Sequence, residues 1–285
     1  MRESSNPVFR SLPKGQGGYA NFGTGAAGGA AAAVHADPYV TQYPDQQQTG
    51  VSRSLTIDDV VTKTGITLVV LSAVAVVSYV LVAQGAPDYP LAMPFTLVGA
   101  LGGLALVMIA MFGRKQDNPA IVLSYAALEG LFLGAFSFII GNLYSNGGPA
   151  MIAQAIVGTF GVFFGMLVVY KTGAIRVTPK FTRMIVAGMF GVLALMLLNF
   201  GLAIFGVGGG EGMGLRSGGP IAIIFSLVVI ALAAFSFLID FDSADQMIRA
   251  GAPEKAAWGI ALGLTVTLVW LYIEILRLLS YFNSD

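Results

Sequence analysis

The sequence predicts an all-α integral membrane protein built as a seven-transmembrane helical bundle, and three observations predict it. Of its 285 residues 56% are hydrophobic and 11% are charged, whereas a soluble globular protein is typically about 25% charged. The apolar residues gather in seven long runs, each close to the roughly 20 residues that cross a bilayer as a helix. The segments between these runs hold glycine, proline and charged residues, which end helices. The lipid bilayer is therefore the expected surrounding.

The first 55 residues form a separate polar segment. They are rich in glycine, alanine, glutamine and proline, with short runs such as GAAGGAAAA and PDQQQ. This composition buries too little apolar surface to fold alone, so residues 1–55 are expected to be a disordered cytoplasmic tail. No apolar core of signal-peptide length follows its basic residues, so a secretory signal is not expected. Residues 56–285 are the expected transmembrane domain.

The seven expected spans have boundaries that are good to a few residues. Thr56 followed by Asp59 resembles a capping box, which predicts a helix start directly after Thr56. Six spans plus a re-entrant segment remain an alternative, if one apolar run does not cross the bilayer. The apolar runs occupy 64–84, 91–113, 119–141, 150–170, 184–207, 220–241 and 257–282.

The basic residues predict the orientation. With the N-terminus inside, the outer loops hold only Arg216, and Arg277 lies within the last span. Cytoplasmic loops are enriched in lysine and arginine, so the N-terminus is expected in the cytoplasm and the C-terminus outside. The inner segments hold the other basic residues, Arg2, Arg10, Lys14, Arg53, Lys63, Arg114, Lys115, Lys171, Arg176, Lys180, Arg183, Arg249 and Lys255.

Stripes of small residues mark expected helix contacts. Glycines at steps of three or four let two helix backbones approach closely. Packing within the chain is the favoured interpretation, and a homodimer face is the alternative. The stripes are Gly99 with Gly103, Gly130 with Gly134, and Gly158 with Gly161 and Gly165.

Composition also excludes several classes of function. The absence of cysteine rules out disulfides and thiol catalysis, and a single histidine, His35, rules out a multi-histidine metal site or a Ser–His triad within one chain. The glycine-rich run GVGGGEGMG lacks the lysine of a phosphate-binding loop and is interpreted as a flexible outer loop. A formal net charge of zero recruits no nucleic acid. Neither enzymatic activity nor a bound cofactor is expected.

Glu129 is the first acid at membrane depth. It lies about ten residues into the third span, roughly 15 Å deep at 1.5 Å per residue. No charged residue lies three or four positions away, so its carboxyl group must find a partner on another helix, face water or stay protonated. An ion or proton site is the favoured interpretation because intramembrane acids are costly. A hydrogen bond to a serine, threonine or tyrosine is the structural alternative.

Four more acids lie on the last two spans. Asp242 and Asp245 can share one helix face near the end of the sixth span, and Asp240 points elsewhere. Such oxygen ligands suit a hard cation such as Ca²⁺, although a solvated helix end beside Arg249 is equally compatible. Glu274 lies in WLYIEILRLL, where an ion pair with Arg277 three residues on is the structural alternative to a functional site.

These same residues carry a resemblance to a family. FDSADQMI followed by a span with LYIEILRLL resembles the Bax inhibitor-1 family of transmembrane Bax-inhibitor-motif proteins, as does EGLFLG in the third span. The NPVF opening and the WGIALGLTVTLVWLYIEILRLL ending look most like its actinobacterial branch. The resemblance implies a seven-helix bundle with the last helix central. It also implies a pH-sensitive Ca²⁺ leak of the bacterial inner membrane, in which two carboxylates, here Asp242 and Glu274, share a proton and gate the pore.

The spacing of these two acids departs from that pattern. They are 32 residues apart (274 − 242), which exceeds the two dozen or so residues typical of the family. A turn near Gly251–Pro253 then separates the two carboxylates by about 18 Å along straight antiparallel helices. Direct pairing needs an extended or partly re-entrant 249–258 segment. Otherwise Glu274 pairs with Glu129 or Arg277, and Asp242 acts alone.

Two functions are compatible with these features. The first is a cation leak channel or exchanger for Ca²⁺ or H⁺, in which Asp242 is the gate and Glu274, Glu129 and Asp240 are candidate Ca²⁺-binding or proton-sensing carboxylates. The second is a regulator that transports nothing and binds a membrane protease or another membrane protein through the tail and the basic loop 171–183.

Overall fold

The computed structural model describes residues 53–145 and 147–283, so the expected tail lies almost entirely outside the described residues. Seven long helices follow one another, and each is long and apolar enough to span a membrane. They are α1 (Ile57–Ala83), α2 (Ala92–Phe112), α3 (Pro119–Phe138), α4 (Gly148–Thr172), α5 (Pro179–Ile204), α6 (Pro220–Arg249) and α7 (Ala256–Phe282). A π-helical turn (Ile139–Leu143) extends α3, and a 3₁₀ turn (Val207–Gly210) follows α5.

These helices confirm the predicted fold class, and in the described residues seven of them, rather than six, are long and apolar enough to cross a membrane. The capping box is present: the Thr56 hydroxyl accepts a hydrogen bond from the Asp59 N–H, and the Asp59 carboxylate accepts one from the Thr56 N–H. It starts α1 at Ile57, seven residues before the predicted apolar run. Helix α6 continues to Arg249 and therefore carries all three aspartates.

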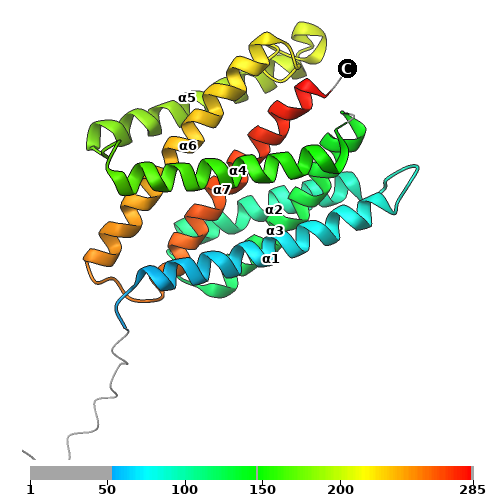
Figure 1. Ribbon diagram of the computed structural model, residues 1–285. Coiled ribbons are helices and arrows are strands. Elements are labelled where there is room, and N and C mark those ends of the chain that lie inside the picture. Colours follow the sequence, from blue (N-terminus) through cyan, green and yellow to red (C-terminus); the bar gives the residue numbers. More distant parts are fainter. Residues whose placement is uncertain (1–52, 146, 284–285) are drawn as a thin grey trace, which may run out of the picture. The chain divides into compact units, whose positions relative to one another are not determined.

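Helix α7 lies at the centre of the bundle. It is by far the most buried span, and 67% of its apolar window is covered by other helices. In Figure 1 it runs between α1–α3 on one side and α4–α6 on the other. The largest apolar cluster joins α6 to α7 through Phe237, Leu264, Leu268 and Leu271. The prediction that the last helix is central is confirmed.

Glycines bring α1, α2 and α3 into backbone contact. A Cβ at Gly99 of α2 would meet the backbone of Phe132 on α3, and one at Gly134 of α3 would meet the carbonyl of Ala75 on α1. These stripes pack as predicted. In the α4 stripe only Gly158 packs against a neighbour, since a Cβ there would lie 3.5 Å from Ile275 of α7. For Gly161 and Gly165 the prediction of packing within the chain is wrong, because a Cβ at either position meets no atom within 4 Å.

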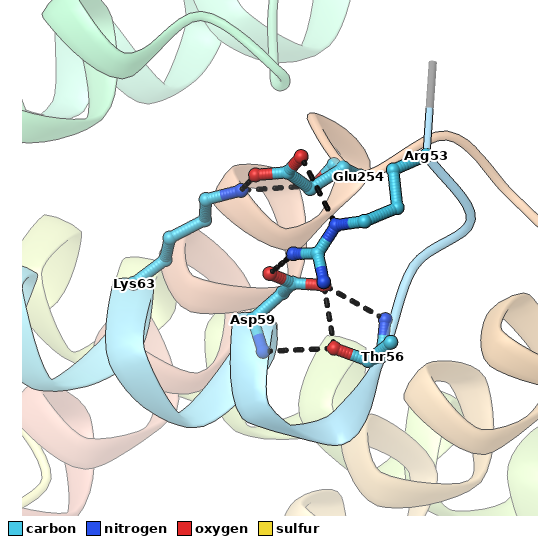
Figure 2. A network of polar contacts seen from close by, with 5 residues as sticks. All are labelled: Arg53, Thr56, Asp59, Lys63 and Glu254. Carbon is cyan, nitrogen blue, oxygen red and sulfur yellow. Dashed lines mark hydrogen bonds and ion pairs between the residues drawn. The ribbon is translucent and has the colours of Figure 1, made fainter. Parts of the chain in front are cut away.

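One end of the bundle, called the basic end below, carries Arg53 and the α2–α3, α4–α5 and α6–α7 connections. A network shown in Figure 2 ties the start of α1 to the α6–α7 connection there. Lys63 donates a 3.0 Å hydrogen bond to the Glu254 carboxylate, and Arg53 forms ion pairs with Glu254 and Asp59. The Glu254 N–H also donates to the Arg53 carbonyl at 2.9 Å. These contacts hold the ends of α6 and α7 against α1. The other end is called the opposite end.

Candidate functional site

The candidate site follows one face of α7. Gly263, Thr267, Leu271 and Glu274 are spaced four, four and three residues apart, so they form a single stripe along this helix. The stripe runs from the basic end toward the opposite end. Its polar members contact different acids and bases of the bundle.

Asp240 of α6 lies in a cleft at the basic end. The cleft has a volume of about 420 Å³ and is lined by α6, α7 and the α2–α3 connection. Thr267 donates a 2.7 Å hydrogen bond to Asp240 Oδ2 and so joins the two helices. Two α7 glycines, Gly259 and Gly263, line the cleft without side chains. A Cβ at Gly263 would meet no atom within 4 Å, so this glycine adds to the space beside Asp240.

An ion pair stands at the border of this basic-end cleft. Lys255, directly before α7, contacts the Asp117 carboxylate at 2.8 Å, and Asp117 also lines the cleft. The hydrogen bond from Lys255 lowers the pKa of Asp117 below its ordinary value, and the positive charge acts in the same direction. Asp117 therefore keeps its negative charge beside the cleft into the acid range.

Glu274 belongs to a different charge cluster, near the opposite end. Its side chain is only 2% exposed and receives two hydrogen bonds from Arg216, at 2.9 Å from Nη1 and 2.8 Å from Nη2. Arg277, one turn further along α7, lies 3.6 Å from the same carboxylate. A paired fork-to-carboxylate contact of this kind fixes geometry as well as charge. Two guanidinium groups thus neutralise one buried acid.

Arg216 reaches Glu274 from the α5–α6 connection. The neighbouring Leu215 is buried, and the Arg216 guanidinium lies over the Phe225 ring with its carbon 5.3 Å from the ring centre. Leu215 and Arg216 thus anchor the chain in the bundle directly after the glycine-rich run 206–214, and the flexibility predicted for that run stays a prediction. A second cleft of about 380 Å³ opens here, lined by Arg216, Arg277 and Glu211 among others.

An apolar layer lies between the two clefts. Leu271 stands between Thr267 and Glu274 on the stripe and is completely buried. Across from it, Ala233 and Phe237 of α6 are also fully buried and belong to the same cluster. Seven residues separate Thr267 from Glu274, or about 10 Å at 1.5 Å per residue. In the described structure this apolar layer therefore separates Asp240, which lines the basic-end cleft, from the buried Glu274, whose partners Arg216 and Arg277 line the opposite-end cleft.

Asp242 and Asp245 face away from this stripe. The Tyr170 hydroxyl of α4 lies 3.4 Å from Asp242 and 3.3 Å from Asp245, and Gln246 donates to Asp242 at 2.6 Å. Arg249 forms an ion pair with Asp245 at 2.7 Å. Asp242 and Asp245 thus share a face, as expected, and Asp240 points elsewhere. Asp242 does not contact Glu274, so the direct pair implied by the family resemblance is absent from this conformation.

Glu129 of α3 lies against α2. Its Oε1 accepts a 3.3 Å hydrogen bond from the Tyr125 hydroxyl one turn earlier. Its Oε2 is buried beside Gly103, and within residues 53–145 and 147–283 no polar atom lies in hydrogen-bond reach of it. The structural alternative for Glu129, a bond to tyrosine, is therefore present. Glu129 does not pair with Glu274, whose partners are the two arginines.

The acids that the sequence predicts as site residues thus lie at separate positions in the bundle. Across the described ranges, which omit 1–52, 146 and 284–285, no three aspartate, glutamate or histidine side chains gather as a metal site. Sequence reasoning missed Arg216 and Thr267. The signal for Arg216 was its position as the one basic residue of the predicted outer loops. Thr267 carried no such signal, because a threonine inside an apolar helix ordinarily bonds its own backbone.

The fold and these clefts define a polytopic α-helical membrane protein whose central helix carries a buried acid and contacts a second one. The family comparison agrees with this class. The chain belongs to the Bax inhibitor 1 like family, whose model matches residues 6–284. A comparison with curated protein sequences finds no match.

Proposed function

We propose that this protein is a pH-sensitive leak pathway for Ca²⁺ in the bacterial inner membrane, with its N-terminus in the cytoplasm. Family membership supports a membrane protein that is a cation channel or a regulator. The observation that carries the proposal is the pair of clefts at opposite ends of the bundle. One contains Asp240, and the other is lined by Arg216 and Arg277, which contact the buried Glu274. The positive-inside rule makes the basic end cytoplasmic.

The described conformation is the closed state of this pathway. The buried Leu271 and Phe237 exclude water between the clefts, and a cation cannot cross an apolar layer without its hydration shell at acceptable cost. Arg216 and Arg277 add positive charge beside Glu274. Opening therefore requires α6 and α7 to separate at this layer and Arg216 to leave Glu274. The Glu274 carboxylate then becomes an oxygen ligand of the type that Ca²⁺ prefers.

The pH dependence of the proposed pathway is what the family resemblance implies. A carboxyl group binds a cation only in its charged form, so protonation of a pathway carboxylate such as Asp240, which lies in the basic-end cleft, changes the flux.

The test is Ca²⁺ influx into proteoliposomes that contain a Ca²⁺-sensitive dye, measured between pH 6 and pH 8. The full-length protein is expected to pass Ca²⁺ with a clear pH dependence. Asp240→Asn is expected to reduce the flux about tenfold and to remove most of its pH dependence, and Glu274→Gln, which frees Arg216, is expected to alter the flux at every pH. A matched control, Asp58→Asn on the exposed start of α1, is expected to retain both properties.

Flux that is unchanged in both Asp240→Asn and Glu274→Gln would overturn the proposal. Asp242→Ala serves as a third variant, and because Asp242 lies outside the stripe we expect a smaller effect than at Asp240. A protein that passes no Ca²⁺ at any pH, yet binds a membrane partner that is lost on deletion of residues 1–50, would support the regulator instead. The lack of a nucleophile–base pair in the sequence supports the further proposal that the protein is not an enzyme.

A further inference from the structure

A third cavity, separate from both clefts, lies among α1, α3, α4 and α7. Its volume is about 310 Å³, within the roughly 300–1,000 Å³ of small-molecule sites. Its walls are almost entirely apolar, and the side chains include Leu71, Leu133, Ile152 and Val269. No aspartate or glutamate of the described residues lines it. The ligand that such walls favour is a hydrocarbon.

The cavity opens sideways, toward the lipid. Three of its lining residues have large exposed side chains, and they lie on two different helices: Val76 on α1 is 64% exposed, and Ile156 and Phe160 on α4 are 44% and 39% exposed. All three lie inside helices that are long and apolar enough to span the membrane. The medium at this depth is the acyl chains of the bilayer, because water is excluded there.

The length of the cavity fits one lipid chain. Its α1 wall extends from Leu68, near the middle of the helix, to Tyr79, near the opposite end. The 11 steps between these two residues span about 16 Å at 1.5 Å per residue. One leaflet contributes about 15 Å, or half of the roughly 30 Å hydrocarbon core. The cavity therefore has the length of a single acyl chain that enters from the leaflet at the opposite end.

The polar groups of the cavity agree with this occupant. At its floor, Ser137 of α3 and Tyr272 of α7 are both buried. Their hydroxyl groups form a hydrogen bond, with 2.7 Å between the two oxygens. These two hydroxyl groups therefore need no hydrogen-bond partner from a ligand. At the opposite end, the Tyr79 hydroxyl accepts a 3.1 Å hydrogen bond from Asn142. Its own O–H hydrogen remains available as a donor where the ester group of a lipid would lie.

We propose that this cavity binds one acyl chain of a membrane phospholipid, with the methyl end near Leu68 and the ester end near Tyr79. An apolar cavity without an occupant forfeits contacts along its walls, and a lipid chain restores them. The bound chain contacts α1, α4 and α7 together. It therefore fills the gap between the two helix groups on either side of the central helix, and it does so without any role in the proposed Ca²⁺ pathway.

The experiment uses the full-length protein in nanodiscs that contain a phospholipid with a photoreactive diazirine in the middle of one acyl chain. Adducts are located by peptide mass spectrometry after irradiation. We expect labelling concentrated on the residues that line the cavity. Ser72→Phe on the rim fills the mouth and is expected to lower this labelling at least fivefold. Val69→Phe is the matched control, because Val69 is 68% exposed on the same helix and does not line the cavity.

A second blocking variant, Val76→Trp, keeps the test decisive if Ser72→Phe does not fold. Labelling spread evenly over all lipid-facing residues, or labelling that neither blocking variant lowers, would overturn the proposal. A diazirine fatty acid is run in parallel with excess unlabelled phospholipid. Stronger labelling of the cavity by the fatty acid under these conditions would overturn the assignment to a phospholipid chain.

Discussion

The Arg216–Glu274 contact is predicted to be strongly coupled in the folding free energy. Glu274 is 2% exposed and Arg216 is 20% exposed, and two hydrogen bonds of 2.8 and 2.9 Å join them. The perturbation is a double-mutant cycle with Arg216→Gln and Glu274→Gln. Both variants keep most of the side-chain volume and remove the charge, so the cycle isolates the interaction between the two charges.

The magnitude follows from burial and geometry. Removing one partner of a fully buried ion pair costs about 3–5 kcal/mol, because the other charge is left without compensation. Here Arg277 remains 3.6 Å from Glu274, and Arg216 is partly exposed. We therefore expect Arg216→Gln to lower the free energy of unfolding by about 2 kcal/mol, at the low end for hydrogen bonds to charged groups. The coupling energy of the cycle is expected to be about 1.5 kcal/mol.

The assay is reversible unfolding in mixed detergent micelles, followed by circular dichroism and the fluorescence of Trp258 and Trp270. The Asp245–Arg249 pair is the internal control, since these side chains are 37% and 78% exposed. Exposed pairs of this spacing contribute about 0.3–0.5 kcal/mol. A coupling energy below about 0.5 kcal/mol for Arg216 with Glu274 would refute the reasoning, because distant sites already deviate from additivity by that much.

Three further predictions test the packing and the basic end. Gly134→Ala is expected to cost about 1–3 kcal/mol because its Cβ meets the α1 backbone, whereas Gly161→Ala, in open space, is expected to be neutral or slightly stabilising in the same unfolding assay. Glu254→Gln is expected to cost about 1 kcal/mol and to speed amide exchange at the start of α1, as measured by hydrogen–deuterium exchange. Because the pKa of Asp117 is lowered, its ion pair stabilises the fold above pH 3.8 and this contribution is lost as the pH falls further. Lys255→Met should therefore reduce the loss of stability in acid, and an unaltered pH profile would contradict the contact.

Much of the fold could be predicted from the sequence because bilayer thickness and backbone hydrogen bonding leave few choices. The number of spans, the start of α1 and the close contacts of Gly99 and Gly134 follow from composition, capping and small-residue spacing. The α4 stripe shows where this logic stops. A stripe of glycines permits close approach but does not say which helix approaches, and Gly161 meets no neighbour in the described structure.

The candidate site was only partly predictable, because it depends on contacts between distant segments. The burial of Glu274 and its proximity to Arg277 follow from a local pattern on one helix. The stronger partner, Arg216, lies 58 residues away in sequence, and the glycines around it suggested flexibility. What identifies Arg216 is its charge. It is the only basic residue of the predicted outer loops, so it is expected to pair with an acidic side chain nearby.

The register between α6 and α7 decides how the acids can act. The hydrogen bond between Thr267 and Asp240 places these two residues at the same level of α7 and α6. Because the two helices run antiparallel, residue 265 of α7 is then level with Asp242 of α6. Glu274 lies nine residues beyond that level, or about 14 Å at 1.5 Å per residue. This is shorter than the roughly 18 Å expected from the 32-residue spacing, but it still rules out a shared proton between Asp242 and Glu274 in this conformation. Asp240 is the α6 acid nearest in height to Glu274, at about 10 Å. A two-carboxylate gate along the central helix would therefore use Asp240 and Glu274, and the flux of Asp240→Asn relative to Asp242→Ala decides between the two arrangements.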